Sequence, residues 1–326
     1  MMYLYIAIGF VLLLGGAEFL VKGSVGLARR VGVSPLVIGM TVVALGTSAP
    51  EFVVSLDAAL ENAAGIATGN IIGSNIANIL LILGVTALIK PIKGDPSAIM
   101  RDGVILLGCS AVFTFLCTQG VLGFSSGAVL FGLFIAFLGY SYWRERHGDD
   151  PEAAELHAQE ADEIESPENV WVMLLMTFGG IGAVVFGAEL LVDGGTQVAR
   201  QFGVSEEVIG LTMIAIGTSL PELAASGMAA IRGHTDVALG NVIGSNLFNI
   251  LGVLGAVAMI QQLPVAEQLL DFDLWIMMGA TVLLIPFMVT RWELSRKEGL
   301  VFAVAYIAYI SAQAYGVDRV LELVQL

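Results

Sequence analysis

One segment of this chain occurs twice, and the two copies align without an insertion or a deletion. Residues 15–84 align with residues 186–255 at a constant offset of 171, and 36 of the 70 aligned pairs are identical. The identical pairs include Glu51 with Glu222, and the tripeptide Gly-Ser-Asn recurs at the equivalent place. The fold must therefore contain the same structural unit twice.

The composition indicates that this unit folds in lipid. Hydrophobic residues make up 57% of the 326 residues and charged residues only 13%, whereas soluble domains carry about one quarter charged residues. A bilayer-spanning helix needs about 20 apolar residues, and lipid leaves no other partner for the backbone groups of such a run. We predict an all-α integral membrane protein with ten transmembrane helices, near residues 2–22, 35–60, 66–89, 102–118, 123–143, 170–192, 206–231, 236–260, 273–290 and 299–316.

The two copies are predicted to have opposite orientations in the membrane. Five spans, an odd number, separate the start of one copy from the start of the other, so the second copy enters from the opposite face. Inverted repeats of this kind are typical of secondary transporters with a binding site near the middle of the bilayer. We predict three parts: an N-terminal five-helix repeat (1–143), a linker (144–169) and a C-terminal inverted five-helix repeat (170–326).

Charge indicates the orientation of the whole chain. When the predicted loops are assigned alternately to the two sides, twelve Lys and Arg residues fall on one side and two on the other. The basic side is expected to be cytoplasmic, which places both termini on the extracytoplasmic side of the cell (inner) membrane. The linker would then be cytoplasmic, and its nine acidic residues between Asp149 and Glu168 are typical of a solvated connector.

The second helix of each copy carries a motif that interrupts helices. The motifs are Gly-Thr-Ser-Ala-Pro-Glu, ending at Glu51, and Gly-Thr-Ser-Leu-Pro-Glu, ending at Glu222. Pro50 and Pro221 cannot donate a backbone hydrogen bond, so carbonyl oxygens in the preceding turn become available. Interrupted helices near the bilayer centre are where transporters of this class bind ions.

Oxygen ligands gather around both motifs. Glu51 and Glu222 would be costly inside the membrane without a partner, and no basic residue lies near either in the sequence. A cation is therefore the expected partner, and carboxylates with neutral oxygens but no His or Cys favour Ca²⁺ or Na⁺ over zinc or copper. The other candidate ligands are the hydroxyl groups beside each carboxylate and the polar stripe of the following helix, namely Thr47, Ser48, Thr218, Ser219, Ser74, Ser245, Asn78 and Asn249.

Three other acidic residues have a weaker claim to the site. Glu18 is followed one turn later by Lys22, which favours a structural ion pair, and Glu189 is its counterpart in the second copy. Asp57 lies six residues after Glu51 on another face of the helix, and its counterpart is Met228. We leave all three outside the predicted site.

The paired motifs, each followed by Gly-Asn-Ile-Ile-Gly-Ser-Asn or Gly-Asn-Val-Ile-Gly-Ser-Asn, resemble the α-1 and α-2 repeats of the sodium/calcium exchanger family, prokaryotic type. The resemblance implies that the carbonyls of Ala44 and Ala215 complete the central sites and that Ser74 and Ser245 join flanking Na⁺ sites. It also implies that the long first and sixth helices slide across the bundle. Some members carry an acidic residue at a position matching Asn78 or Asn249, whereas both are Asn here, which leaves the stoichiometry open.

The function we expect is secondary active exchange of Na⁺ for Ca²⁺ by alternating access, with extrusion of calcium. Ca²⁺/H⁺ exchange and K⁺-dependent Na⁺/Ca²⁺ exchange are the alternatives, because the same carboxylates could carry other cations; a passive cation channel is a third reading. An enzyme is not expected, since the chain has no phosphate-binding glycine loop with its lysine. The partners are the transported ions and the lipid bilayer, with no prosthetic group, nucleic acid or protein partner implied.

Overall fold

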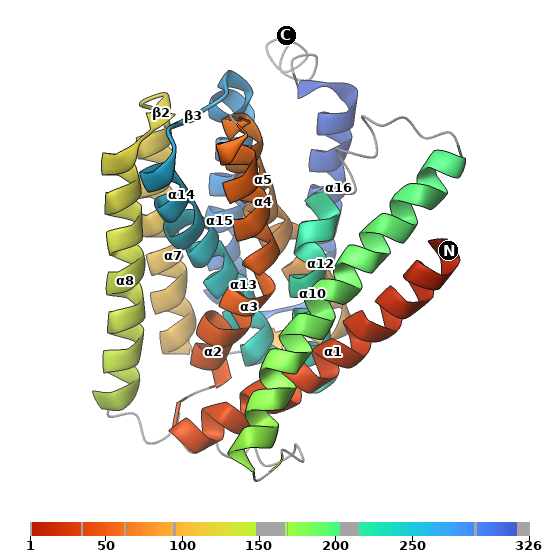
Figure 1. The fold of residues 1–326 in the computed structure, drawn as a ribbon. Helices are drawn as coiled ribbons and strands as arrows, with labels where there is room; N and C mark the ends of the chain where they lie inside the picture. Colours follow the sequence, from red (N-terminus) through yellow and green to blue (C-terminus); the bar gives the residue numbers. More distant parts are fainter. Residues whose placement is uncertain are drawn as a thin grey trace.

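The computed structural model describes residues 2–33, 35–61, 63–93, 96–147, 167, 169–202, 215–289 and 292–317. Most of the linker 144–169 therefore lies outside the described residues. Within them the chain is helical apart from four strands of two residues each and short turns and loops, and Figure 1 shows the helices as one bundle. The predicted all-α fold is confirmed.

The first half of the chain contains one long helix followed by helices with breaks and π-helical turns. Its elements are α1 (Met2–Val31), α2 (Pro35–Ile38), η1 (Gly39–Val43), α3 (Ala44–Thr47), α4 (Ala49–Leu60), α5 (Ala64–Ile76), η2 (Ala77–Leu83), α6 (Gly84–Ile89), β1 (Ile92–Lys93), α7 (Pro96–Cys117), β2 (Val121–Leu122) and α8 (Phe124–His147).

The second half repeats this order. Its elements are α10 (Val170–Gln201), α12 (Ala215–Ile231), α13 (Thr235–Leu247), η4 (Phe248–Val253), α14 (Leu254–Ile260), β3 (Leu263–Pro264), η5 (Leu269–Asp273), α15 (Leu274–Val289), β4 (Glu293–Leu294) and α16 (Arg296–Tyr315). The counterparts of α2 and η1 fall in residues 203–214, outside the described part.

Seven described helices are long and apolar enough to cross a membrane, and an eighth span results if the bent pair before and after Ser48 is counted as one. The other two predicted spans correspond to α12, which is described from Ala215 onward, and to α16, which begins with charged residues. The exact count of ten stays a prediction. The candidate spans are nevertheless consistent with a bundle that crosses the bilayer many times.

The contacts between the halves follow the internal repeat. β1 pairs with β4 and β2 pairs with β3, both antiparallel, and an offset of 171 converts Ile92 and Lys93 of β1 into Leu263 and Pro264 of β3. The π-helical segments η2 and η4 likewise occupy equivalent places in the third helix of each copy. Each two-stranded sheet is therefore formed by one strand from each half of the chain.

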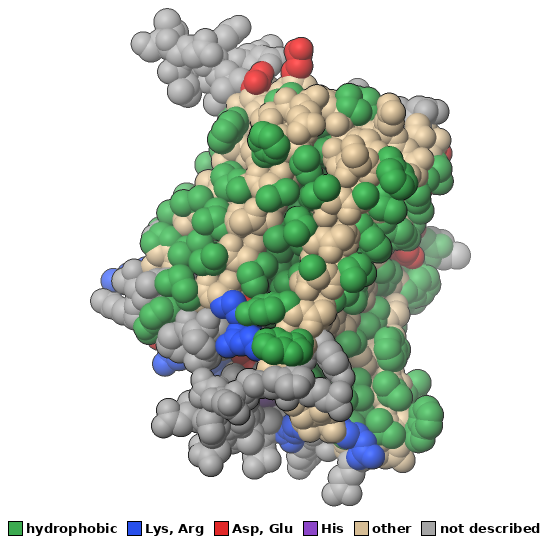
Figure 2. Space-filling model, turned by 90° about the vertical axis from the view of Figure 1, so that its left-hand side faces the viewer, with side chains coloured by type: hydrophobic (Ala, Val, Ile, Leu, Met, Phe, Trp, Pro, Cys, Tyr) green, Lys and Arg blue, Asp and Glu red, His purple; other side chains and the backbone are tan. Residues whose placement is uncertain are grey.

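The core lies along the third helices. Residues 65–89 and 235–260 each have 78% of their most apolar window buried, against 33% or less for the other candidate spans. The outer helices instead carry exposed apolar side chains such as Phe115, Trp171 and Leu175, which is the pattern of a surface that contacts lipid. In the view of Figure 2 hydrophobic side chains cover the middle of the molecule, and the visible Lys and Arg side chains lie in its lower part.

Candidate metal centre

The helix that carries Glu51 is broken as expected. The helical segments before and after Ser48 differ in direction by 49°, and α4 starts with Pro50 and Glu51 in its first turn. Proline is tolerated there because the first N–H groups of a helix have no partner within it. A carboxylate in the first turn is favoured by the partial positive charge of the helix start. The break therefore holds Glu51 at a helix start inside the membrane.

The second copy differs from this expectation. α12 runs without interruption from Ala215 to Ile231 with Pro221 inside it. The prediction of a break at the second motif is therefore wrong for the described residues. Proline removes one hydrogen bond and need not end a helix when packing supports the turns on either side. Glu222 accordingly lies within a helix, whereas Glu51 lies at a helix start.

The two carboxylates meet in the centre of the molecule. Glu51 and Glu222 are both 0% exposed, and they lie close enough to repel each other electrostatically. Neither makes an ion pair with a described Lys, Arg or His side chain. Two buried carboxylates without a basic partner are costly in a membrane interior and therefore call for a cation.

Hydroxyl groups surround the carboxylates from both copies. The Ser48 hydroxyl donates to Oε1 of Glu222 at 2.7 Å, so a side chain of the first copy binds the carboxylate of the second. The hydroxyls of Ser74 and Thr218 lie beside Glu51, whose two carboxylate oxygens have no hydrogen-bond partner. Thr47 and Ser245 stand in the same relation to Glu222, and the Thr47 hydroxyl also reaches Oδ1 of Asn241 at 3.3 Å.

The asparagines bind the copies together by two matching sets of bonds. Nδ2 of Asn78 donates to Oδ1 of Asn246 at 3.0 Å, and Nδ2 of Asn249 donates to Oδ1 of Asn75 at 3.4 Å. Asn78 lies in η2 and Asn249 in η4. π-helical turns occur often at functional sites, and here they present the two predicted asparagines towards the partner copy.

A second pair of bonds positions the carboxylate helices. Nδ2 of Asn70 donates to the Ser55 hydroxyl at 3.1 Å, and its counterpart in the second copy does the same to Ser226 at 3.0 Å. Sequence reasoning missed Ser55, Ser226, Asn75 and Asn246 as parts of this network. The signal was present, because each is identical to its counterpart in the repeat.

The backbone carbonyls of Ala44 and Ala215 are the remaining predicted ligands. The carbonyl of Ala44 accepts from the N–H of Ser48 at 3.0 Å and also from the Thr47 hydroxyl at 3.5 Å. Ala215 is the first described residue of α12. The role of both carbonyls as ligands stays a prediction.

Several oxygen atoms in this network are buried without a hydrogen-bond partner. They are both carboxylate oxygens of Glu51, Oε2 of Glu222, Oδ1 of Asn78, Oδ1 of Asn249, and the hydroxyls of Ser219 and Ser245. Buried polar atoms almost always have a partner. Carboxylate, amide and hydroxyl oxygens are the ligands of hard cations, so the residues present fit Ca²⁺ or Na⁺ as cargo.

The acidic residues left outside the site have other surroundings. Glu18 pairs with Lys22 at 2.8 Å, as predicted, and Asp57 is exposed. Glu189 lines a cavity of about 440 Å³ between α4, α10 and α12. Pro50, the residue before Glu51, and Thr218 also line this cavity.

Comparison with known proteins identifies the family. The family model described as "Sodium/calcium exchanger protein" matches residues 1–143 and 171–315. The sodium/calcium exchanger MaX1 of Methanosarcina acetivorans is 33% identical over 96% of this chain and 98% of its own, and the inner membrane protein YrbG of Escherichia coli is 37% identical over 90% and 89%. A solved structure of the sodium-calcium exchanger NCX_Mj superposes with a TM-score of 0.82 at 33% identity, covering 95% of this chain and 98% of that one. The chain therefore belongs to the sodium/calcium exchanger family, whose members are membrane antiporters of calcium and a second cation.

Proposed function

We propose that this protein exchanges Na⁺ for Ca²⁺ and that Glu51 and Glu222 carry both ions in turn. The observation that supports this most directly is the set of buried oxygens without a hydrogen-bond partner around the two carboxylates. Two negative charges balance one Ca²⁺ or two Na⁺. Solved structures of the relative NCX_Mj come from crystals soaked with Na⁺ and Ca²⁺ or with Na⁺ and Sr²⁺.

The proposed ligands come from both copies. Thr47, Ser48, Thr218 and Ser219 would complete the central shell with the carbonyls of Ala44 and Ala215, while Ser74, Ser245, Asn78 and Asn249 would hold flanking ions. Bound Na⁺ and Ca²⁺ would exclude each other, because together they would leave excess positive charge buried. Exclusive occupancy is what couples the movement of one ion to that of the other.

Alternating access would come from the two long helices. α1 and α10 are expected to slide together across the remaining bundle, which would expose the centre first to one side and then to the other. The cavity between α10 and α4 supports an exit for ions on one side in the present conformation, because Thr218, one of the proposed ligands, lines it.

Proton exchange is the second candidate. The two facing carboxylates would be relieved of their repulsion by a proton as well as by a metal ion, so the geometry also supports Ca²⁺/H⁺ exchange. K⁺-dependent Na⁺/Ca²⁺ exchange would use the same oxygens. A passive channel has less support, since the carboxylates are fully buried.

We further propose the placement of the chain in the cell membrane. The basic side would face the cytoplasm, both termini would face outward, and the acidic linker 144–169 would join the repeats 1–143 and 170–326 on the cytoplasmic side.

Uptake of ⁴⁵Ca²⁺ into proteoliposomes tests the counter-ion. Vesicles loaded with Na⁺ should take up calcium when diluted into Na⁺-free buffer, and vesicles loaded with K⁺ or carrying only a proton gradient should not. Glu222→Gln should abolish the uptake, while Asp57→Asn, an exposed carboxylate on the same helix as Glu51, should leave it intact. Uptake driven by the proton gradient alone would overturn sodium coupling, and uptake without any counter-ion would indicate a channel.

A further inference from the structure

α1 and α10 form one closely packed antiparallel pair, seen side by side in Figure 1. A Cβ atom on Gly16 would lie 2.8 Å from the Cβ of Ala183, and one on Gly180 would lie 2.6 Å from the backbone nitrogen of Leu20. Both distances are shorter than side chains tolerate, so only glycine permits this approach. The pair can therefore shift against the bundle as a unit more easily than its two helices can shift against each other.

One ionic contact ties this pair to the bundle. Oε2 of Glu18, on α1, accepts from Nε of Arg232 at 2.7 Å, and its Oε1 lies 2.6 Å from Nη2 of the same side chain. Lys22, one turn further along α1, lies 2.8 Å from the same carboxylate. Arg232 is in the turn between α12 and α13, so the two-pronged ion pair joins a sliding helix to a helix turn of the bundle.

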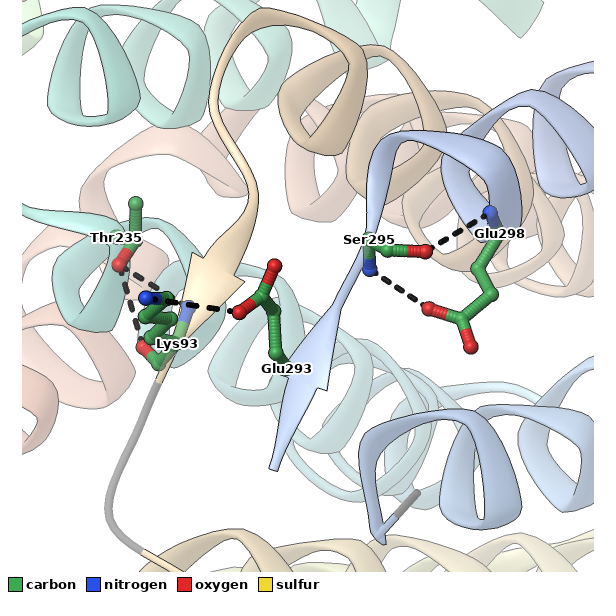
Figure 3. Close-up of polar contacts among 5 residues, drawn as sticks. All are labelled: Lys93, Thr235, Glu293, Ser295 and Glu298. Atoms are coloured by element: carbon green, nitrogen blue, oxygen red, sulfur yellow. Dashed lines mark hydrogen bonds and ion pairs between the residues drawn. The ribbon is translucent and has the colours of Figure 1, made fainter. Parts of the chain in front are cut away.

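The turn that carries Arg232 is held firmly. The Thr235 hydroxyl donates to the carbonyl of Lys93 at 3.2 Å and accepts from its N–H at 3.3 Å. Lys93 belongs to β1, which pairs with β4, and its Nζ lies 3.6 Å from Glu293 of that strand. Figure 3 shows these contacts with the neighbouring Ser295 and Glu298, whose capping box starts α16. Arg232 therefore projects from a platform fixed to two further helices.

Among the residues that the structure describes, the opposite end of the molecule has no equivalent ion pair. The repeat counterparts of Glu18, Lys22 and Arg232 are Glu189, Asp193 and Glu61. All three are acidic, so the attraction between Glu18 and Arg232 has no counterpart among these residues. Glu189 and Asp193 line the cavity, and neither forms an ion pair with a described residue.

We propose that Glu18 and Arg232 form a latch that holds their own end of the molecule closed and thereby favours the state with the cavity open at the other end. This rests on the proposed exchange function, in which α1 and α10 slide. Sliding breaks the latch, and the three carboxylates at the opposite end cannot form a matching one. The two states of the exchanger therefore differ in stability even though the ion ligands are repeated in both copies.

The size of the effect follows from the exposure of the pair. Side chains of Glu18 and Arg232 are 17% and 47% exposed, so the contact is a partly solvated, bidentate ion pair. Such a pair present in one of two states changes their population ratio by about fivefold.

Distances between spin labels at Val53→Cys on α4 and Phe186→Cys on α10 measure this ratio, in a chain whose two native cysteines are replaced by alanine. Both positions are exposed and lie near the cavity wall. Arg232→Gln should lower the ratio of open to closed cavity about fivefold in ion-free protein. Lys297→Gln, which removes an exposed positive charge without a described partner, should leave the ratio unchanged.

A second variant, which adds an ion pair instead of removing one, keeps the latch testable if Arg232→Gln fails to fold. Glu61→Arg places a guanidinium at the position equivalent to Arg232, where it can pair with Glu189, and should also lower the open fraction. Unchanged ratios in both Arg232→Gln and Glu61→Arg would overturn the latch. Exchange by the unlabelled wild type is measured separately, so its absence would refute the proposed function while the distances still report on the latch.

Discussion

Removing one central charge should weaken calcium binding far more than it weakens the fold. Glu51→Gln and Glu222→Gln each keep the shape of the side chain and leave a single carboxylate to balance Ca²⁺. Loss of one partner from a buried charged cluster costs about 3–5 kcal/mol. That energy corresponds to a rise in the calcium dissociation constant of roughly a hundredfold to several thousandfold.

The structure explains why the fold should survive. The amide oxygen of Gln at position 222 can still accept the hydrogen bond that Ser48 donates to Glu222 at 2.7 Å. Both oxygens of Glu51 lack a hydrogen-bond donor, so its replacement breaks no such bond. Without metal, the repulsion between two facing carboxylates disappears in either variant, and the ion-free melting temperature should not fall.

Calorimetry with Ca²⁺ and thermal unfolding with and without Ca²⁺ provide the assay. Calcium at a hundred times its dissociation constant should stabilise the wild type by about 2.7 kcal/mol, and at the same concentration it should stabilise neither Gln variant measurably. Asp57→Asn is the matched control and should bind calcium like the wild type. A change of less than about fivefold in both Gln variants would refute the assignment of the two carboxylates.

Three further predictions concern coupling, the flanking sites and pH. Raising Na⁺ should increase the apparent dissociation constant of Ca²⁺ with an order above one, as titrations at fixed Na⁺ concentrations can show; calcium affinity that ignores sodium but falls on acidification would favour proton exchange. Ser74→Ala and Ser245→Ala should weaken Na⁺ binding more than Ca²⁺ binding in calorimetry, and equal losses would indicate a structural role. Burial and nearby positive charges lower the pKa of His234 to about 4, so the unfolded chain binds a proton more readily than the folded one. The free energy of unfolding should therefore fall as the pH drops from about 6.5 to about 4. Denaturation of His234→Asn at several pH values should not show this fall.

The two carboxylates and the hydroxyl groups around them could be singled out from the sequence because they recur in the repeat, and their role as ligands stays a prediction. Glu51 and Glu222 are identical counterparts inside apolar helices, and ionisable groups in such places are costly enough to imply a function. The structure brings the two side chains together, with Ser48 bound to the carboxylate of the other copy. The contact across the copies is consistent with the inverted arrangement that the odd number of spans predicts.

The asparagine bridges could not be predicted from helical spacing. An α-helix places residues four apart on one face, which selects Ser74 and Asn78 together. The chain instead becomes π-helical from Ala77 onward. A π turn holds an extra residue and so rotates the side chains that follow it. Asn78, the second residue of this π-helical segment, donates to Asn246, and no pattern of hydrophobic residues reports the change of period.

The two copies are identical at the central carboxylates but differ in charge at their ends. A residue proposed to bind the transported ion would serve both states, so its counterpart is expected to be the same, as Glu51 and Glu222 are. A residue at one end contacts its neighbours in only one state, so its counterpart can differ, as Arg232 and Glu61 do in charge. Since a ligand that binds two states equally cannot shift their ratio, the preference for one state must come from positions where the copies differ. Direction and bias in this exchanger are therefore to be sought at unmatched charged positions rather than among the ion ligands.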